Sequence, residues 1–178
     1  RASDWSSDVC SSDLNCCLFD VAAVLKDGFE MGNVWYNEPK TLDTAFDVMG
    51  DIILSTAAQQ YGGFTVPEVD KILAPYAKKS YDRYIEEFMQ YSDPSWAGRE
   101  EKAIERALDK VRRDYDQGWQ GIEYKLNTVG SSRGDYPFVT VTLGLGTGQF
   151  EKMCSMSLLA VHKGGQGKEG HKKPVLFP

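Results

Sequence analysis

Phe138-Val139-Thr140-Val141-Thr142-Leu143 is the stretch that decides the fold class, because apolar residues and threonines alternate along it as they do in a half-buried β-strand. Glycines at positions 144, 146 and 148 follow directly, and the pattern then changes to that of a helix over about residues 150–162. Three longer helical segments precede this stretch. Strands that are separated by long helices predict an α/β fold rather than a pure helical bundle.

The first long helical segment is expected over about residues 41–61. Thr41 is suited to the N-cap, and Gly62-Gly63 supplies the residue type that commonly ends a helix. Apolar residues recur at steps of three and four along the segment, so they define a single buried face. That face consists of Leu42, Phe46, Met49, Ile53 and Ala57.

The second and third long helical segments are expected over about residues 67–91 and 97–129. Pro67 is acceptable in a first turn, whereas Pro75 lies inside the pattern and is expected to kink the helix. Each segment has a thin apolar stripe. Such a stripe can pack against the other helix, against the core of the chain or against a second subunit. The sequence does not choose between these. The stripe of the third segment consists of Ile104, Leu108, Val111, Tyr115, Ile122 and Leu126, at near-heptad spacing.

Shorter elements are expected nearer the N-terminus. Residues 16–19 are an apolar run suited to a buried strand, and Asp20 can then cap a short helix through Leu25 that Gly28 closes. Residues 33–40 are expected to form a turn-rich connection.

The two ends of the chain differ in character. Residues 1–14 nearly repeat a Ser/Asp-rich motif and have neither helical nor strand periodicity, so we interpret them as a non-native, adapter-like leader outside the fold. Residues 164–173 are a glycine-rich, basic loop, and residues 174–177 are expected to begin another buried strand.

The composition excludes several classes of protein. The 178 residues are 42% hydrophobic and 12% aromatic, which is enough for one domain with a substantial core. A net charge of -6 disfavours general binding to nucleic acid or to an anionic membrane, and no apolar run is long enough to span a bilayer. The four cysteines lack the paired spacing of a zinc site, so no metal site is expected, and their low number favours a reducing, cytoplasmic setting.

Two short motifs are candidates for chemistry. The glycine-rich loop 144–148 lies between a strand and a helix, so it either binds an anion at the helix N-terminus or simply allows a tight turn. Asn15-Cys16-Cys17 places thiols on a strand, where adjacent residues face opposite sides and only one thiol can enter a given pocket. From residue types alone, both a redox role and simple burial explain these cysteines.

Several short motifs occur in a fixed order along the chain. They are Asn15-Cys16-Cys17-Leu18-Phe19-Asp20, Gly28-Phe29-Glu30-Met31-Gly32-Asn33, Glu38-Pro39-Lys40, Tyr61-Gly62-Gly63, Leu73-Ala74-Pro75, Pro137-Phe138-Val139-Thr140 and Gly144-Leu145-Gly146-Thr147. This ordered set resembles the catalytic (large) subunit of class III anaerobic ribonucleoside-triphosphate reductases over residues 15–178. The order carries the resemblance, since no single motif is specific.

The resemblance implies a fold and a reaction. Residues 15–178 would be a helix-rich part of a ten-stranded α/β barrel, with effector and dimer helices over about residues 41–129. The family reduces ribonucleoside triphosphates to their deoxy forms for DNA synthesis, using a glycyl radical that generates a thiyl radical. A second cysteine, on a barrel strand, supplies hydrogen beneath the ribose. Cys16 matches this second cysteine, Asn15 is the implied substrate-binding neighbour, and Cys17 is expected to point into the barrel wall.

The resemblance also implies partners and cofactors. The family forms a homodimer that a radical-SAM enzyme activates, contains a structural zinc, and uses formate or a thioredoxin-like protein as reductant. An ATP or deoxynucleotide effector binds near the dimer helices. Asn37, Asp51 and Arg83 match its contact positions but differ from the Glu, Gln and Lys expected there. Arg83 keeps the positive charge that a phosphate needs, whereas Asn37 and Asp51 leave the nucleotide preference open.

These considerations predict an internal fragment of such an enzyme. The thiyl-bearing loop, the zinc-binding cysteines and the glycyl segment are expected after Pro178, and an ATP-binding cone before Asn15. The fragment alone is therefore expected to be inactive. The alternative is a helical dimerisation or interaction module without catalysis, built on the stripes of residues 67–91 and 97–129.

Overall fold

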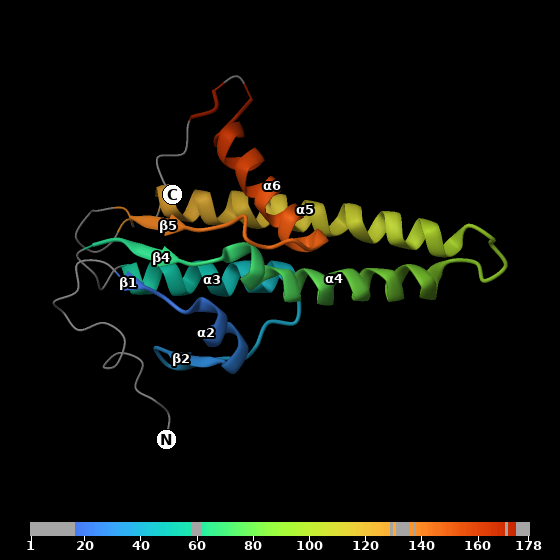
Figure 1. Cartoon of the computed structure of the whole chain (residues 1–178), viewed down its shortest axis with the longest axis horizontal. Helices are drawn as coiled ribbons and strands as arrows, with labels where there is room; N and C mark the ends of the chain where they lie inside the picture. Colours follow the sequence, from blue (N-terminus) through green and yellow to red (C-terminus); the bar gives the residue numbers. More distant parts are fainter. Residues whose placement is uncertain are drawn as a thin grey trace.

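The computed structural model describes residues 17–57, 62–128, 130, 136, 138–169 and 171–173. In these residues the elements follow the order β1, α2, β2, β3, α3, β4, α4, α5, β5, α6 (Figure 1). The expected helix-rich α/β class is confirmed, but the described residues show small sheets and no barrel. The leader, Asn15, Cys16 and the strand expected at residues 174–177 lie outside the described residues.

A three-stranded parallel sheet forms the centre of the fold. β4 (Phe64–Val66) lies between β1 (Cys17–Leu18) and β5 (Val139–Val141). β1 and β5 were predicted from the runs at residues 16–19 and 138–143, whereas β4 was not, because Gly63 and Pro67 leave only three residues between them. The register aligns Cys17, Phe64 and Val139, which are all buried on the face that packs against the helices.

The first helix begins and ends as the sequence predicts. α2 (Val21–Asp27) has Asp20 as its N-cap, and the Asp20 carboxylate accepts a hydrogen bond from the Ala23 N–H at 3.1 Å. Gly28 follows the last turn with a φ of 73°, a value that glycine adopts without strain.

The structure corrects the turn-rich connection that was expected at residues 33–40. β2 (Phe29–Met31) and β3 (Val34–Tyr36) form an antiparallel hairpin there, followed by an irregular segment. The Phe29 and Tyr36 rings stack with their centroids 4.9 Å apart, so a cross-strand aromatic pair stabilises a hairpin that is too short for local patterns to reveal.

Helix α3 (Leu42–Ala57) confirms its predicted cap and, from Leu42 to Ile53, its predicted face, whereas Ala57 is only partly buried. The helix begins after Thr41, whose hydroxyl oxygen accepts a hydrogen bond from the Thr44 N–H at 3.4 Å. Leu42, Phe46, Met49 and Ile53 are buried in the core. The predicted end near residue 61 lies outside the described residues.

The two longest helices form an antiparallel hairpin that extends away from the sheet (Figure 1). α4 (Val69–Tyr91) runs through Pro75, and α5 (Arg99–Thr128) returns beside it. α6 (Gln149–Gly164) packs against both. The apolar stripes are thus used within the chain, and the kink expected at Pro75 stays a prediction.

The first turns of α5 correct the predicted stripe. Ile104 is 45% exposed, whereas Ala103 and Ala107 are buried in its place. A helix of 3.6 residues per turn drifts away from heptad spacing, which explains why the prediction holds from Val111 onward and fails before it. None of the helices in the described residues combines the length and apolar composition needed to cross a membrane.

Candidate functional site

The face of the sheet that points away from the helices is the first part of the candidate site. Cys17 is 9% exposed and belongs to the hydrophobic core, in agreement with the expectation that its side chain points into the packed layer. Leu18, the next residue along the strand, is 70% exposed. Successive side chains of a strand point to opposite faces, so β1 separates a packed face from an open one.

Phe138 lies on the open face, at the edge where the strands begin. Its carbonyl oxygen accepts the Phe64 N–H at 2.8 Å, and its ring lies over Gly63 on the neighbouring chain segment. A Cβ at Gly63 would lie 2.9 Å from Phe138 Cδ1, so glycine is what leaves room for the ring. The ring of Phe138 thus covers Gly63, which precedes β4.

The glycine-rich loop lies at the opposite edge, where the parallel strands end. The carboxylate of Asp70, in the first turn of α4, accepts hydrogen bonds from the N–H groups of Gly144 and Gly146, both at 3.0 Å. The Glu151 carboxylate lies against Gly148 at the start of α6. Protein carboxylates therefore occupy the positions that a phosphate would need, and the geometry supports the tight-turn interpretation of this loop rather than the anion site.

The three residues matched to the effector site come from different elements of the fold. Asn37 is exposed after β3, and Asp51 on α3 pairs with Lys125 on α5 at 3.7 Å. The guanidinium of Arg83 lies 5.1 Å from the centre of the Tyr84 ring. Tyr84 contacts α5 about three helical turns before Lys125, a distance of about 16 Å along the axis.

Tyr84 is the centre of an electrostatic cluster between α4 and α5. Its hydroxyl donates a hydrogen bond to Asp114 at 2.7 Å, and Lys110 lies 4.6 Å from the centre of its ring. Burial, with the hydrogen bond to Asp114, raises the pKa of Tyr84 to about 12. Burial also raises the pKa of Asp114, and the nearby Asp43 carboxylate adds to this effect. The arrangement keeps Tyr84 protonated and places two cations, Arg83 and Lys110, against its ring.

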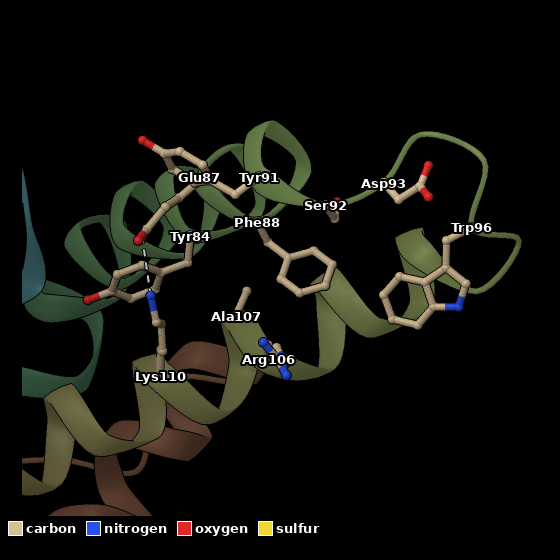
Figure 2. Close-up of a pocket in the computed structure, with 10 residues that line it drawn as sticks. All are labelled: Tyr84, Glu87, Phe88, Tyr91, Ser92, Asp93, Trp96, Arg106, Ala107 and Lys110. Carbon is tan, nitrogen blue, oxygen red and sulfur yellow. Dashed lines mark hydrogen bonds and ion pairs between the residues drawn. The ribbon is translucent and has the colours of Figure 1, made fainter.

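A cleft of about 420 Å³ continues from Tyr84 toward the end of the hairpin. Figure 2 shows the Phe88 ring facing Trp96 across it, with Arg106 on the α5 side. The Phe88 and Trp96 centroids are 6.2 Å apart, and the Arg106 guanidinium lies 5.2 Å from the centre of Phe88. The sequence analysis missed this cleft, although aromatic residues at positions 84, 88 and 91 share one helix face.

The described residues contain no cluster of three or more His, Cys, Asp or Glu side chains that could hold a metal ion. The structural zinc that the resemblance implies therefore has no ligand set in this part of the chain, and no step below depends on it.

Comparisons with known proteins identify the family. The family model described as anaerobic ribonucleoside-triphosphate reductase matches residues 7–178. The anaerobic ribonucleoside-triphosphate reductase of Enterobacteria phage T4 is 36% identical over 156 residues, which cover 88% of this chain and 25% of the phage protein. The reductases of Haemophilus influenzae and Escherichia coli are 35% and 33% identical over 164 residues, covering 92% of this chain and 22% of each relative.

The chain thus spans about a quarter of the length of the curated relatives it matches. The family model matches well over half of the residues of this chain. The chain belongs to the anaerobic ribonucleoside-triphosphate reductase family.

Proposed function

We propose that this chain is the part of an anaerobic ribonucleoside-triphosphate reductase that carries the reducing strand cysteine and the effector helices. The complete protein converts ribonucleoside triphosphates to deoxyribonucleoside triphosphates for DNA synthesis. The observation that carries the proposal is the family match over residues 7–178, which includes the Asn15-Cys16 motif and all of the described elements. In the proposal, residues 15–178 contribute to the ten-stranded barrel of the catalytic domain.

The proposal assigns Cys16 as the thiol that delivers hydrogen to the ribose. Support comes from the neighbouring residues of β1: Cys17 is in the core, whereas Leu18 is on the open face. Alternation along the strand predicts that Cys16 shares the face of Leu18. In that position Cys16 is a hydrogen donor to the sugar and Asn15 is a binding neighbour, and a thiol displaced by a few ångströms would be ineffective.

The reaction requires groups that we place elsewhere in the complete enzyme. A glycyl radical supplies the oxidising equivalent that generates a thiyl radical, and formate or a thioredoxin-like protein restores the reduced state. In the proposal a radical-SAM enzyme activates the protein, a structural zinc is bound by other residues, and the active form is a cytoplasmic homodimer. On this assignment, the isolated segment has no reductase activity of its own.

Effector binding is assigned to the helices. Asn37, Asp51 and Arg83 come from separate elements of the fold. We propose that the binding site for an ATP or deoxynucleotide effector is completed at the homodimer interface, with Arg83 contacting phosphate.

The direct test is an activity measurement on the complete protein. After anaerobic activation, it is incubated with each of the four ribonucleoside triphosphates and a formate or thioredoxin-type reductant. Formation of the corresponding deoxyribonucleoside triphosphate is expected. If the activated protein carries a glycyl radical, detected by electron paramagnetic resonance, and still yields no product from any of the four, the proposed function is wrong.

A further inference from the structure

The junction between β4 and α4 holds a fully buried carboxylate. Asp70 is 0% exposed, and its Oδ2 atom accepts two backbone hydrogen bonds, from Gly144 and Gly146. Its other oxygen, Oδ1, is buried without a hydrogen-bond partner among the described residues. Burying a half-satisfied carboxylate is costly, so such a group in a native fold calls for an explanation beyond packing.

A second unfavourable feature lies two residues earlier. Glu68 has a φ of 48°, in the left-handed region that non-glycine residues rarely adopt. Its N–H donates to the Thr142 hydroxyl oxygen at 2.7 Å, and the N–H of Val69 donates to the Thr142 carbonyl at 2.9 Å. The strained residue thus serves to connect α4 to the segment that follows β5. Backbone strain of this kind concentrates at functional sites.

Both features act on the same loop. Residues 142–146 follow β5 at the carboxyl edge of a parallel sheet, the edge outside which open α/β sheets bind their ligands. The loop is attached to the β4–α4 junction at Thr142, Gly144 and Gly146. A Cβ at Gly146 would lie 2.4 Å from Glu151 Cβ and 3.0 Å from Asp70 Oδ2, so the backbone is fitted closely between the two acidic residues.

We propose that Asp70 is a positioning residue for the substrate: it fixes the loop 144–147 in the conformation that contacts the base of the ribonucleoside triphosphate. This inference rests on the proposed function. The loop presents Leu145, which is 66% exposed, together with the exposed Thr147. These side chains suit a base.

The triphosphate is assigned to another part of the complete enzyme. Asp70 and Glu151 both lie directly behind the loop, so negative charge adjacent to it is unfavourable. The amide groups of Gly144 and Gly146, which would otherwise bind phosphate oxygens, already donate to Asp70. The loop therefore recognises the uncharged base of the nucleotide.

The test uses Asp70→Ala and Asp70→Asn in the complete reductase, with steady-state kinetics for each ribonucleoside triphosphate. The alanine variant loses both hydrogen bonds, and we expect KM to rise about tenfold, by different factors for the four bases, with a smaller change in kcat. The asparagine variant keeps an acceptor oxygen, and we expect it to stay within about threefold of wild type. Effector affinity, measured by calorimetry with dATP, is expected to be unchanged in both.

Two further variants keep the test decisive. Gly146→Ala displaces the loop while leaving Asp70 in place, so it is expected to raise KM about tenfold as well. It provides the test if Asp70→Ala fails to fold. Asp109→Ala removes an exposed carboxylate from α5 and is expected to have wild-type kinetics.

The outcomes separate this inference from the proposed function. Wild-type KM values for a folded Asp70→Ala variant, or for Gly146→Ala, would overturn the positioning role while leaving the reductase assignment intact. Equal KM increases for all four bases, accompanied by weaker dATP binding, would also overturn it, because they indicate general loosening of the fold. An activated but inactive wild-type enzyme would instead refute the proposed function.

Discussion

Gly118 of α5 lies directly against the ring of Phe46 on α3: a Cβ added at Gly118 would stand 2.2 Å from Phe46 Cδ2. The same ring makes an edge contact with Trp119, with centroids 5.1 Å apart, and another with Tyr115 at 6.1 Å. α3 and α5 therefore approach as closely as a missing side chain allows. This contact fixes the helix that carries Asp51 against the helix that carries Lys125.

Gly118→Ala is expected to destabilise the fold. The added methyl group overlaps a ring that is itself packed against Trp119, so it cannot move freely. Overpacking of this kind costs about 1–3 kcal/mol, which outweighs the higher helix propensity of alanine. Chemical unfolding of the chain measures the difference.

Gly121 supplies the matched control for this experiment. It lies one turn later on α5, and a Cβ there would meet no atom within 4 Å. Gly121→Ala is expected to stabilise the fold by about 0.5–1 kcal/mol, because alanine favours the helix. If both substitutions shift the unfolding midpoint equally, the close contact between α3 and α5 at Gly118 is contradicted.

Arg83→Ala is expected to weaken binding of dATP to the complete reductase. A charge-assisted hydrogen bond to phosphate contributes about 1.5–3 kcal/mol, so the dissociation constant should rise about tenfold to a hundredfold. Arg83→Lys keeps the charge and is expected to lose less. Isothermal titration calorimetry provides the measurement.

Arg112, an exposed arginine on α5, serves as the control for net charge. Arg112→Ala is expected to bind dATP as wild type does. An equal loss in both variants would show that Arg83 acts only through general electrostatics and not at the effector site.

The elements predicted from the sequence are those that local chemistry determines. Asp20 and Thr41 fix the starts of α2 and α3 through side-chain caps, and Gly28 ends α2. The long helices follow from apolar periodicity over many turns. These signals depend on residues within a few positions of each other, so they are readable without a structure.

The features that were missed depend on distant residues. Asp70 resembles an ordinary acidic residue in a first helical turn, and only the fold shows that it binds Gly144 and Gly146, which are 74 and 76 positions away in sequence. β4 and the β2–β3 hairpin lie in sequence runs that are shorter than those at residues 16–19 and 138–143, from which β1 and β5 were predicted. The cleft between Phe88 and Trp96 likewise exists only because α4 and α5 fold back on each other.

Stability is expected to fall with rising pH because of Glu123, which is buried between α5 and α6. Its carboxylate contacts His162 Nδ1 at 3.2 Å and accepts a hydrogen bond from Gln166 at 3.3 Å, yet burial raises its pKa above the ordinary glutamate value. The folded state thus holds this proton more tightly than the unfolded state. The contribution of Glu123 to stability is greatest below the unfolded pKa and declines as pH rises through the raised one.

Glu123→Gln removes this titration. Its free energy of unfolding is expected to decline less than that of wild type as the pH rises above the ordinary glutamate pKa, as measured by urea unfolding. Glu101→Gln, at an exposed position on the same helix, should keep the wild-type slope. A wild-type slope in Glu123→Gln would contradict the raised pKa.

Cys16 and Cys17 provide the most direct test of the reductase assignment. They are adjacent and chemically identical, but Cys17 is in the core, and the account places Cys16 on the substrate face. The measurement is the rate of deoxyribonucleotide formation by the activated complete enzyme, with each cysteine replaced by serine. We predict that Cys16→Ser abolishes turnover while dATP still binds, and that Cys17→Ser lowers stability but still forms product. Full turnover by Cys16→Ser would contradict the account.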